Sequence, residues 1–424
     1  MKIKDWIKWY KSLHISRKWF VILVLLRPII DSFYGLKEAS ALASPLYIVG
    51  ALTPFLVVGS FLSHKFPRKN KTFQDIPMSI WAIFVAFNCL IFYFIDVSVV
   101  AFGDLIKYCT PFILYFYCRR FVQSRQDMLG LLTAFMIACA YPFFMLLYES
   151  IINPIGIDYL SAGRGGGSRI RGEYADIMNY AIYLAAFLIA MGYLYLRSIY
   201  EKGITIKIKP IYLIITLIFV LYGLTRIKHV STWTVALFCF VLFMVHNLKN
   251  VKGIAMVFAL MIVLLPFFAE DIYIAEIQPL INKEILVAKG ERDSQQALNG
   301  RVNRWEKYIE IWERMPAINH FIGVTTSNFP ETDAMISAGM HSDYIRLLFL
   351  SGFIGLGFYL LSIFFIASNY FELRIPEKFL LAASVSALVL WSVSTIPTLY
   401  APLLYFTYPI FAYALLPKER QYIN

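Results

Sequence analysis

A polar stretch from about residue 270 to residue 340 holds the side chains of this sequence best suited to chemistry. It carries four arginines, Arg301 and Arg304 among them, and it ends at His341, where an apolar run resumes. Histidine titrates near neutral pH, so its imidazole can take a proton from a hydroxyl group. A histidine at a helix start more often only bonds the backbone, so the case for His341 as a base depends on its surroundings. His229 and His320 are weaker candidates.

Two further clusters of cations lie outside this stretch. The segment SAGRGGGSRIRGEYADIMN contains Arg169 and Arg171 beside a run of glycines, which let a backbone approach a ligand closely. The segment LTRIKHV places Arg226 and His229 at the end of an apolar run. A single arginine cluster near a span end usually extends to lipid headgroups. Three clusters favour a site for an anionic headgroup such as a pyrophosphate, because the guanidinium fork matches phosphate oxygens.

The composition is that of an integral membrane protein. Hydrophobic residues make up 59% of the 424 residues and charged residues 16%, against about 45–50% and about 25% in soluble domains. A net charge of +12 would suggest nucleic acid as a partner of a soluble protein, but here most cations fall in short loops between apolar runs, so we expect no nucleic-acid binding. The sequence contains no metal-ligand, P-loop or serine-hydrolase motif. We therefore expect chemistry that needs a base and cations, with no metal or cofactor.

Twelve apolar runs are candidate transmembrane helices, because a span needs about 20 mostly apolar residues and must be helical in lipid. Basic loops alternate with nearly uncharged ones, which predicts that both termini are cytoplasmic. The predicted fold class is an all-α polytopic membrane protein with one large extracytoplasmic loop between the ninth and tenth spans. The approximate spans are 19–35, 44–62, 77–95, 98–117, 129–148, 175–196, 210–225, 231–246, 253–269, 342–366, 378–396 and 399–416.

This pattern divides the chain into four parts: 1–18, 19–269, 270–340 and 341–424. The first part alternates apolar and lysine faces, which is typical of a helix lying on the cytoplasmic membrane surface. The second holds nine spans, and the fourth holds three spans and a short cytoplasmic tail. The third is the large loop, which we interpret as a lid over a site at the membrane.

Within the lid, NGRVNRWEKYIEIWERMP predicts a helix that ends before Pro316. We expect its apolar stripe to rest on the spans or on the membrane interface; the stripe consists of Val302, Trp305, Ile309 and Trp312.

Opposite charges lie three or four residues apart inside three spans. A charge within a membrane costs roughly 2.5–3.5 kcal/mol on insertion scales, so such residues are functional candidates by default. The spacing also lets each pair neutralise itself on one helix face, and both interpretations stay open here. The pairs are Arg27 with Asp31, Asp104 with Lys107, and Asp343 with Arg346.

Several of these segments resemble the O-antigen polymerase and O-antigen ligase superfamily of bacterial envelope glycosyltransferases. GRVNRWEKYIEIWERMPAINHFIGV followed by HSDYIRLLFLSGFIGLGFY is similar to the family's arginine helix, its proline–glycine turn and its histidine opening a span. The matching positions are Gly300, Arg301, Trp305, Pro316, Gly323, His341, Gly352 and Gly355.

Two shorter segments also resemble the family. LTRIKHVSTW is similar to its Ser-Arg-Gly span end, with Arg226 in the arginine position, although Thr225 and Ile227 depart from the pattern. RIRGEYADIMNYAIYLA is similar to its arginine–glycine–asparagine segment and leaves Arg169 and Arg171 as alternatives. Arg304 competes with Arg301 in the same way.

The resemblance implies a GT-C-like fold of about twelve transmembrane helices in the bacterial inner membrane, with short helices in a periplasmic loop. It implies a hexosyltransferase-type enzyme of lipopolysaccharide or polysaccharide biosynthesis that needs neither metal nor cofactor. The donor and partner would be an undecaprenyl-pyrophosphate-linked oligosaccharide, and a chain-length regulator and a flippase would be further partners. His341, Arg226 and Arg301 would be catalytic. The pyrophosphate or glycan would be bound by Arg169, Arg171, Arg304 and His229.

Four functions remain open, and we favour a polymerase that joins one lipid-linked repeat unit to another. Pyrophosphate is already a good leaving group, so a base and cations suffice without a general acid. Direct attack at the anomeric carbon then predicts inversion. A ligase, which moves the glycan to the lipid A core, shares the same segments. A transporter or flippase of lipid-linked oligosaccharides is an alternative of another class, but such proteins often contain inverted repeats and none is evident here. The last alternative is a non-catalytic envelope scaffold.

Overall fold

The computed structural model describes residues 1–38, 44–63, 73–95, 97, 99–152, 157–158, 169–170, 174, 176–201, 207–248, 278, 282, 285–287, 289–291, 301–324 and 341–418. Within these residues the chain is almost entirely helical, as predicted. β1 (Ile157–Asp158) and β2 (Arg169–Ile170) form a small antiparallel sheet in which Ile157 pairs with Ile170.

Seven helical segments in the described part of the chain are long and apolar enough to cross a membrane, which gives the protein the character of a multi-pass membrane protein. They are Pro45–Ser63, Phe73–Ile95, Arg125–Ile151, Met178–Tyr200, Pro210–Ile227, Asp343–Glu372 and Ile375–Ser394. Helices occupy each of the other predicted spans except 253–269, which lies outside the described residues. The count of twelve spans stays a prediction.

Within the described residues, the first half of the chain is mainly helical. Its elements are α1 (Ile3–Ser12), α2 (Ile15–Ser32), η1 (Tyr34–Glu38), α3 (Pro45–Ser63), η3 (Phe73–Asp75), α4 (Ile76–Ile95), α5 (Val99–Phe121), α6 (Arg125–Ala138), α7 (Ala140–Ile151) and α8 (Met178–Tyr200). The predicted span 129–148 is divided between α6 and α7 at Cys139. Pro142 explains the division, because a proline has no N–H to bond a carbonyl four residues earlier.

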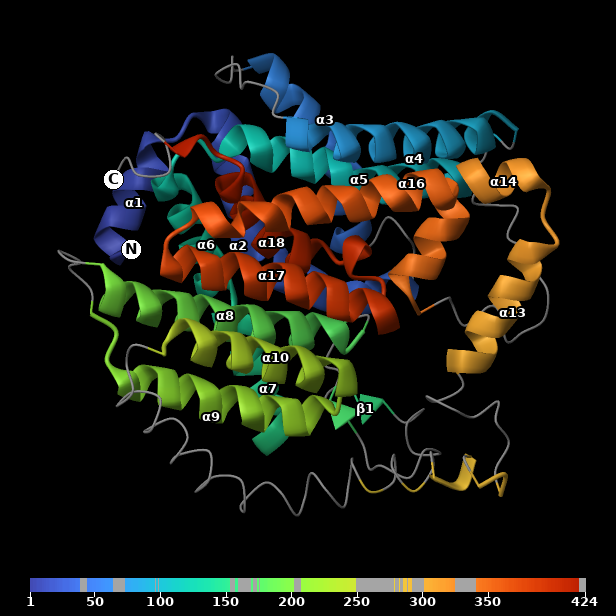
Figure 1. Cartoon of the computed structure of the whole chain (residues 1–424). Helices are drawn as coiled ribbons and strands as arrows, with labels where there is room; N and C mark the ends of the chain where they lie inside the picture. The colour runs from blue at the N-terminus through green and yellow to red at the C-terminus, as the bar shows by residue number, and fades with distance from the viewer. Residues whose placement is uncertain are drawn as a thin grey trace.

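The second half adds the helices of the lid and the C-terminal bundle. These are α9 (Pro210–Ile227), α10 (Val230–His246), α13 (Arg301–Glu313), α14 (Ala317–Ile322), α16 (Asp343–Ser368), η8 (Asn369–Glu372), α17 (Ile375–Ser394), η9 (Pro397–Leu399) and α18 (Ala401–Ala414). Figure 1 shows both termini at one end of the bundle, and β1, α13 and α14 at the opposite end.

The centre of the bundle is α18, in which every residue from Pro402 to Ala414 is buried. A helix that is apolar all round is stable only when it is surrounded, and α18 packs against α2, α5, α6, α8 and α17. At the periphery, α3 leaves large apolar side chains such as Phe55 and Leu62 exposed, which suits contact with lipid.

The turn that follows α14, at the end of the lid, packs against a break in α16. Gly352 has φ 64° and interrupts the helix, and the turn after α14, at Gly323, has φ 87°. The Val324 N–H donates to the Phe349 carbonyl at 2.8 Å. Asn88 of α4 donates from Nδ2 to the carbonyls of Ile322 and Leu350, at 2.6 and 2.8 Å. Carbonyls that the broken helix cannot satisfy are thus bonded by a neighbour.

The N-terminal helix α1 lies within the predicted helix 1–18 and packs on α6. Trp9 is buried and donates from Nε1 to Asp127 Oδ1 at 3.1 Å, and Trp6 donates to the Gly130 carbonyl at 2.9 Å. Ile3 and Ile7 of the same helix are exposed. Contact of α1 with a membrane surface stays a prediction.

A group of ion pairs holds the end of the bundle that carries the termini. Arg125 pairs with Glu201 and with Glu377, and Arg197 Nε lies 2.9 Å from Glu201 Oε2. Burial tends to raise the pKa of Glu201, but the hydrogen bonds from Arg125 and Arg197 outweigh it and leave the pKa below its usual value. The ionised carboxylate of Glu201 therefore stabilises the contact between α6 and α8.

Candidate functional site

His341 is exposed and lies directly before α16, with a backbone φ of 46°. Positive φ is uncommon for a residue with a side chain, and histidine is among the residues that tolerate it best. The prediction that an apolar helix begins beside His341 is confirmed, since α16 starts at Asp343 with Ser342 as its N-cap residue. The imidazole is thus at a fixed helix start rather than on a long loop.

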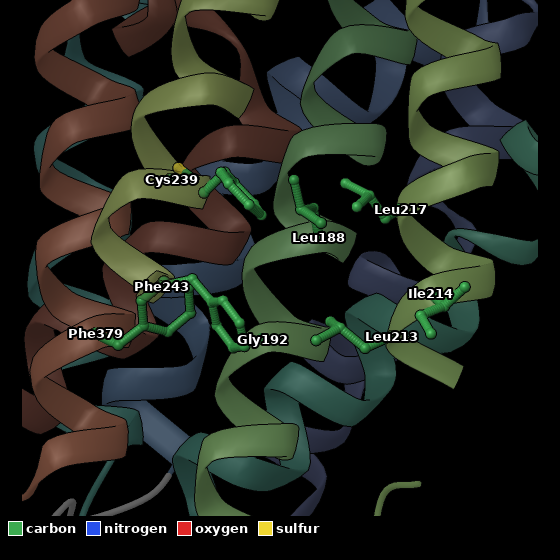
Figure 2. A pocket seen from close by; sticks show the side chains of 9 residues that line it. Leu188, Gly192, Leu213, Ile214, Leu217, Cys239, Phe243 and Phe379 are labelled. Atoms are coloured by element: carbon green, nitrogen blue, oxygen red, sulfur yellow. The ribbon is translucent and has the colours of Figure 1, made fainter. Parts of the chain in front are cut away.

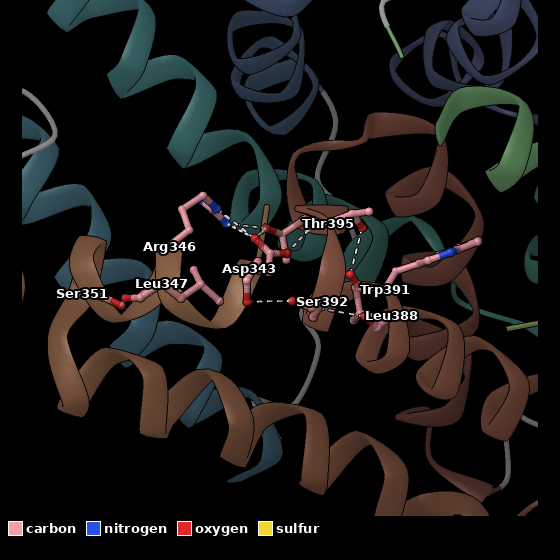
Figure 3. A network of polar contacts seen from close by, with 10 residues as sticks. Asp343, Arg346, Leu347, Ser351, Leu388, Trp391, Ser392 and Thr395 are labelled. Carbon is pink, nitrogen blue, oxygen red and sulfur yellow. Dashed lines mark hydrogen bonds and ion pairs between the residues drawn. The ribbon is translucent and has the colours of Figure 1, made fainter. Parts of the chain in front are cut away.

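The carboxylate of Asp343 is completely buried and accepts four hydrogen bonds. Arg346 donates to its Oδ1 from Nε at 2.8 Å and from Nη2 at 2.7 Å. Thr398 donates its hydroxyl to Oδ1 and its backbone N–H to Oδ2, both at 2.9 Å. Figure 3 shows Asp343 and Arg346 facing each other within this network. Asp343 and Arg346 therefore neutralise each other, which supports the self-neutralising pair among the two interpretations that the sequence left open.

Contacts with α17 hold the same helix start from a second side. Ser342 donates its hydroxyl to the Ser392 carbonyl at 3.2 Å, and Tyr344 donates to the Val389 carbonyl at 3.0 Å. Arg346 also lies over the Tyr108 ring of α5, 5.5 Å from its centroid. The residues that follow His341 therefore contact three neighbouring elements, α5, α17 and η9.

Asp176 connects the start of α8 to the turn after α17. It belongs to the segment SAGRGGGSRIRGEYADIMN, here called the arginine–glycine segment. Asp176 Oδ2 accepts a short hydrogen bond from the Tyr400 hydroxyl, and its Oδ1 accepts the Met178 N–H at 3.2 Å at the start of α8. Arg169 lies in β2, opposite Asp158 in the strand register. Arg171 lies outside the described residues.

Arg226 and His229 lie at the turn between α9 and α10. Arg226 is exposed and its guanidinium lies over the Tyr222 ring, 5.2 Å from the centroid. His229 Nδ1 lies 2.7 Å from Thr232 Oγ1. Lys228 between them adopts φ 47°, and α9 contacts β2, so this turn is next to the strand that contains Arg169.

Arg301 and Arg304 lie in α13, the predicted helix of the lid, and both are half-buried. The helix packs on α16 through Tyr308 and Trp312, whose rings lie 5.8 and 5.1 Å from that of Phe349. Burial raises the pKa of Tyr308, and the nearby cation of Arg304 opposes this shift.

The packed face of α13 differs in part from the predicted stripe. Trp312 is buried as expected, but Ile309 is 44% exposed, and Tyr308 is buried in its place. Tyr308 and Trp312 contact Phe349, three residues before the break in α16 at Gly352. Contact of Ile309 with the membrane interface stays a prediction.

The predicted site residues thus come from two sets of touching elements. One is α9 with β2, which carries Arg226 and Arg169, and the other is α13 with α16, next to His341. The sequence did not identify Asp176, Thr398 and Tyr400 as candidates. These residues form hydrogen bonds that join the starts of α8 and α16 to the turn after α17. The available signal was the polar run TIPTLY in a nearly uncharged loop between two apolar spans.

Two apolar cavities lie between helices of the described residues, and neither is lined by a predicted site residue. One of about 20 Å³ lies between α8, α9, α10 and α17 and is lined by Leu188, Gly192 and Phe379, among others (Figure 2). Another of about 470 Å³ lies between α3, α4 and α5. The first is large enough for only about one water-sized sphere, and its apolar lining gives a water no partner.

Comparison with protein-family models, with curated proteins and with solved structures finds no match to this chain.

Proposed function

We propose that this protein is a membrane glycosyltransferase that polymerises polysaccharide from polyprenyl-pyrophosphate-linked repeat units, in the manner of an O-antigen polymerase. The reaction would take place at the extracytoplasmic face of a bacterial inner membrane. The proposal rests on the residue patterns described above and on the chemistry that those residues can perform.

The observation that carries the proposal is the setting of His341. Its imidazole is exposed, while the backbone next to it is anchored by the buried Asp343 and Arg346. A general base must be accessible to its substrate and held in a defined position. The same end of the bundle carries α13, with Arg301 and Arg304, and the sheet strand β1 (Figure 1). An accessible imidazole at the end of the bundle that also carries these arginines suits a reaction that releases a phosphate anion.

In the proposed reaction, a hydroxyl of the acceptor sugar attacks the anomeric carbon of the donor glycan. The hydroxyl proton passes to His341, a new glycosidic bond forms, and the bond from the anomeric carbon to the phosphate oxygen breaks. Polyprenyl pyrophosphate leaves with the bonding electrons, and Arg226 and Arg301 stabilise its negative charge. A single displacement inverts the configuration at the anomeric carbon.

The test is a transfer reaction with purified protein in lipid vesicles and lipid-linked repeat units extracted from cells that lack this gene. A ladder of longer lipid-linked glycans supports a polymerase. Products that form only when a lipid A core acceptor is added would instead indicate a ligase. Movement of intact donor across the vesicle membrane, with no new glycosidic bond, would indicate a transporter.

A further inference from the structure

The Thr398 hydroxyl connects the start of α16 to the turn between α17 and α18. It accepts a hydrogen bond from Arg346 Nη2 at 2.5 Å and donates one to Asp343 Oδ1 at 2.9 Å. Thr398 itself is completely buried. Its hydroxyl is therefore both an acceptor and a donor between two opposite charges, and an apolar side chain of the same shape could supply neither bond.

Tyr400, two residues further on, makes the equivalent connection to the start of α8. Its hydroxyl bonds Asp176 Oδ2, and Asp176 follows Arg169 and Arg171 within the arginine–glycine segment. The Asp176 carboxylate also accepts the Met178 N–H, so it fixes the first turn of α8. The turn from Pro397 to Tyr400 thus forms hydrogen bonds to the starts of two helices. One is α16, which begins after His341, and the other is α8, which begins after Asp176.

We propose that the turn from Pro397 to Tyr400 sets the relative position of the two halves of the active site, with Thr398 and Tyr400 as positioning residues. Thr398 acts through Asp343 on His341, and Tyr400 acts through Asp176 on the start of α8. This inference rests on the glycosyltransferase activity proposed above. Since the base and the phosphate-binding cations belong to separate elements, a displacement of about 1 Å between them is enough to cost about 100-fold in rate.

The decisive variants change the Thr398 hydroxyl alone. Thr398→Val keeps the shape of the side chain and removes both hydrogen bonds, whereas Thr398→Ser keeps the hydroxyl. Thr407→Val is the matched control, because Thr407 is equally buried and its hydroxyl bonds only the Leu403 carbonyl of its own helix. Melting temperatures of all three, measured in the same vesicles, separate loss of fold from loss of position.

We expect Thr398→Val to lower kcat by about 10- to 100-fold with KM nearly unchanged, because the base is displaced while the cations still bind the donor. Thr398→Ser should restore most of the rate, and Thr407→Val should keep the wild-type rate. The inference is overturned if Thr398→Val keeps the wild-type kcat, or if both valine variants lose activity in proportion to their melting temperatures.

Tyr400→Phe tests the other half of the turn. Loss of its bond to Asp176 should mainly raise KM for the lipid-linked donor, since Asp176 follows Arg169 by seven residues and Arg169 is proposed to bind the pyrophosphate. Tyr370→Phe is the control, because the Tyr370 hydroxyl lies 2.9 Å from His246 Nε2, away from this turn. Equal KM values for Tyr400→Phe, Tyr370→Phe and wild type would contradict the role of Tyr400.

Hydrogen–deuterium exchange tests the positioning without any substrate. The backbone amides of residues 341–348 should exchange at least several-fold faster in Thr398→Val than in Thr407→Val or wild type, because the first turn of α16 loses both bonds of the Thr398 hydroxyl, which join it to the turn after α17. Unchanged exchange would overturn the inference even if the enzyme is active. If wild-type protein makes no glycosidic bond, the proposed function fails, and the exchange rates still decide whether Thr398 holds His341 in place.

Discussion

Phe321 and Gly352 meet backbone to backbone: a Cβ atom built on Gly352 would lie 2.2 Å from the Phe321 carbonyl oxygen. Gly323 has the reciprocal constraint, since its own Cβ would lie 2.7 Å from the Leu350 carbonyl oxygen. The end of the lid therefore fits the break in α16 only when both positions lack a side chain. This contact connects the lid to the helix that starts beside His341.

Gly352→Ala should destabilise the protein strongly. Gly352 has φ 64° and ψ −173°, a backbone conformation that is essentially restricted to glycine and costs another residue about 1–3 kcal/mol, and the close carbonyl adds to that cost. Gly357→Ala is the matched control, because Gly357 lies in the same helix with nothing within 4 Å of its Cβ position. Thermal unfolding should show a lower melting temperature for Gly352→Ala only. Equal melting temperatures would contradict the tight contact.

Asn88→Asp should also weaken the contact between the lid and α16. The change keeps the size of the side chain but removes the amide that donates to the carbonyls of Ile322 and Leu350. Each buried carbonyl left without a donor costs about 1–3 kcal/mol. We expect a lower melting temperature and faster proteolysis within the lid. A variant as stable as wild type would show that other groups satisfy these carbonyls.

Much of the helical fold follows from the sequence, because each apolar run must close its backbone hydrogen bonds within itself in lipid. The start of α16 beside His341 and the pairing of Arg27 with Asp31, 2.7 Å apart, were predictable from spacing alone. The break at Gly352 was not, since a glycine within an apolar run is equally compatible with an unbroken helix. Asn88 lies within a long apolar run of α4, and its partners lie more than 200 residues away.

The candidate site was predictable only in its separate parts. His341 and the arginine segments are visible as polar residues at the ends of apolar runs. Thr398 and Tyr400 also lie between two apolar runs, but the sequence does not show their buried partners, Asp343 and Asp176, which lie on distant elements. Contacts of this kind depend on how α8, α16 and α18 pack, which local periodicity does not specify.

The stability of the protein should fall at acidic pH through Glu201. Its pKa is lowered in the folded state, so its contribution is fully present above the unfolded pKa of about 4.3 and is lost as the pH falls through the folded value. Glu201→Gln should lower the melting temperature at pH 7 and flatten its decline between about pH 5 and pH 3. A wild-type pH profile for this variant would argue against the ion pairs with Arg125 and Arg197.

Arg226→Lys should lose most glycosyl transfer although the charge is kept. The guanidinium can bond two phosphate oxygens at once, whereas a lysine ammonium acts as a point charge. Arg314→Lys is the control, because Arg314 is exposed on the lid and has no proposed role. Transfer rates should fall at least about tenfold for Arg226→Lys only. Full activity in that variant would exclude a bidentate clamp at this position.

The most direct test compares wild-type protein with His341→Ala in the extension of lipid-linked repeat units, with EDTA present. We expect wild-type protein to produce a ladder of longer glycans, since the proposed chemistry uses an imidazole and cations. His341→Ala, inserted in the membrane at the same level, should produce none. A ladder of normal length from His341→Ala, or no extension by wild-type protein, would contradict the account.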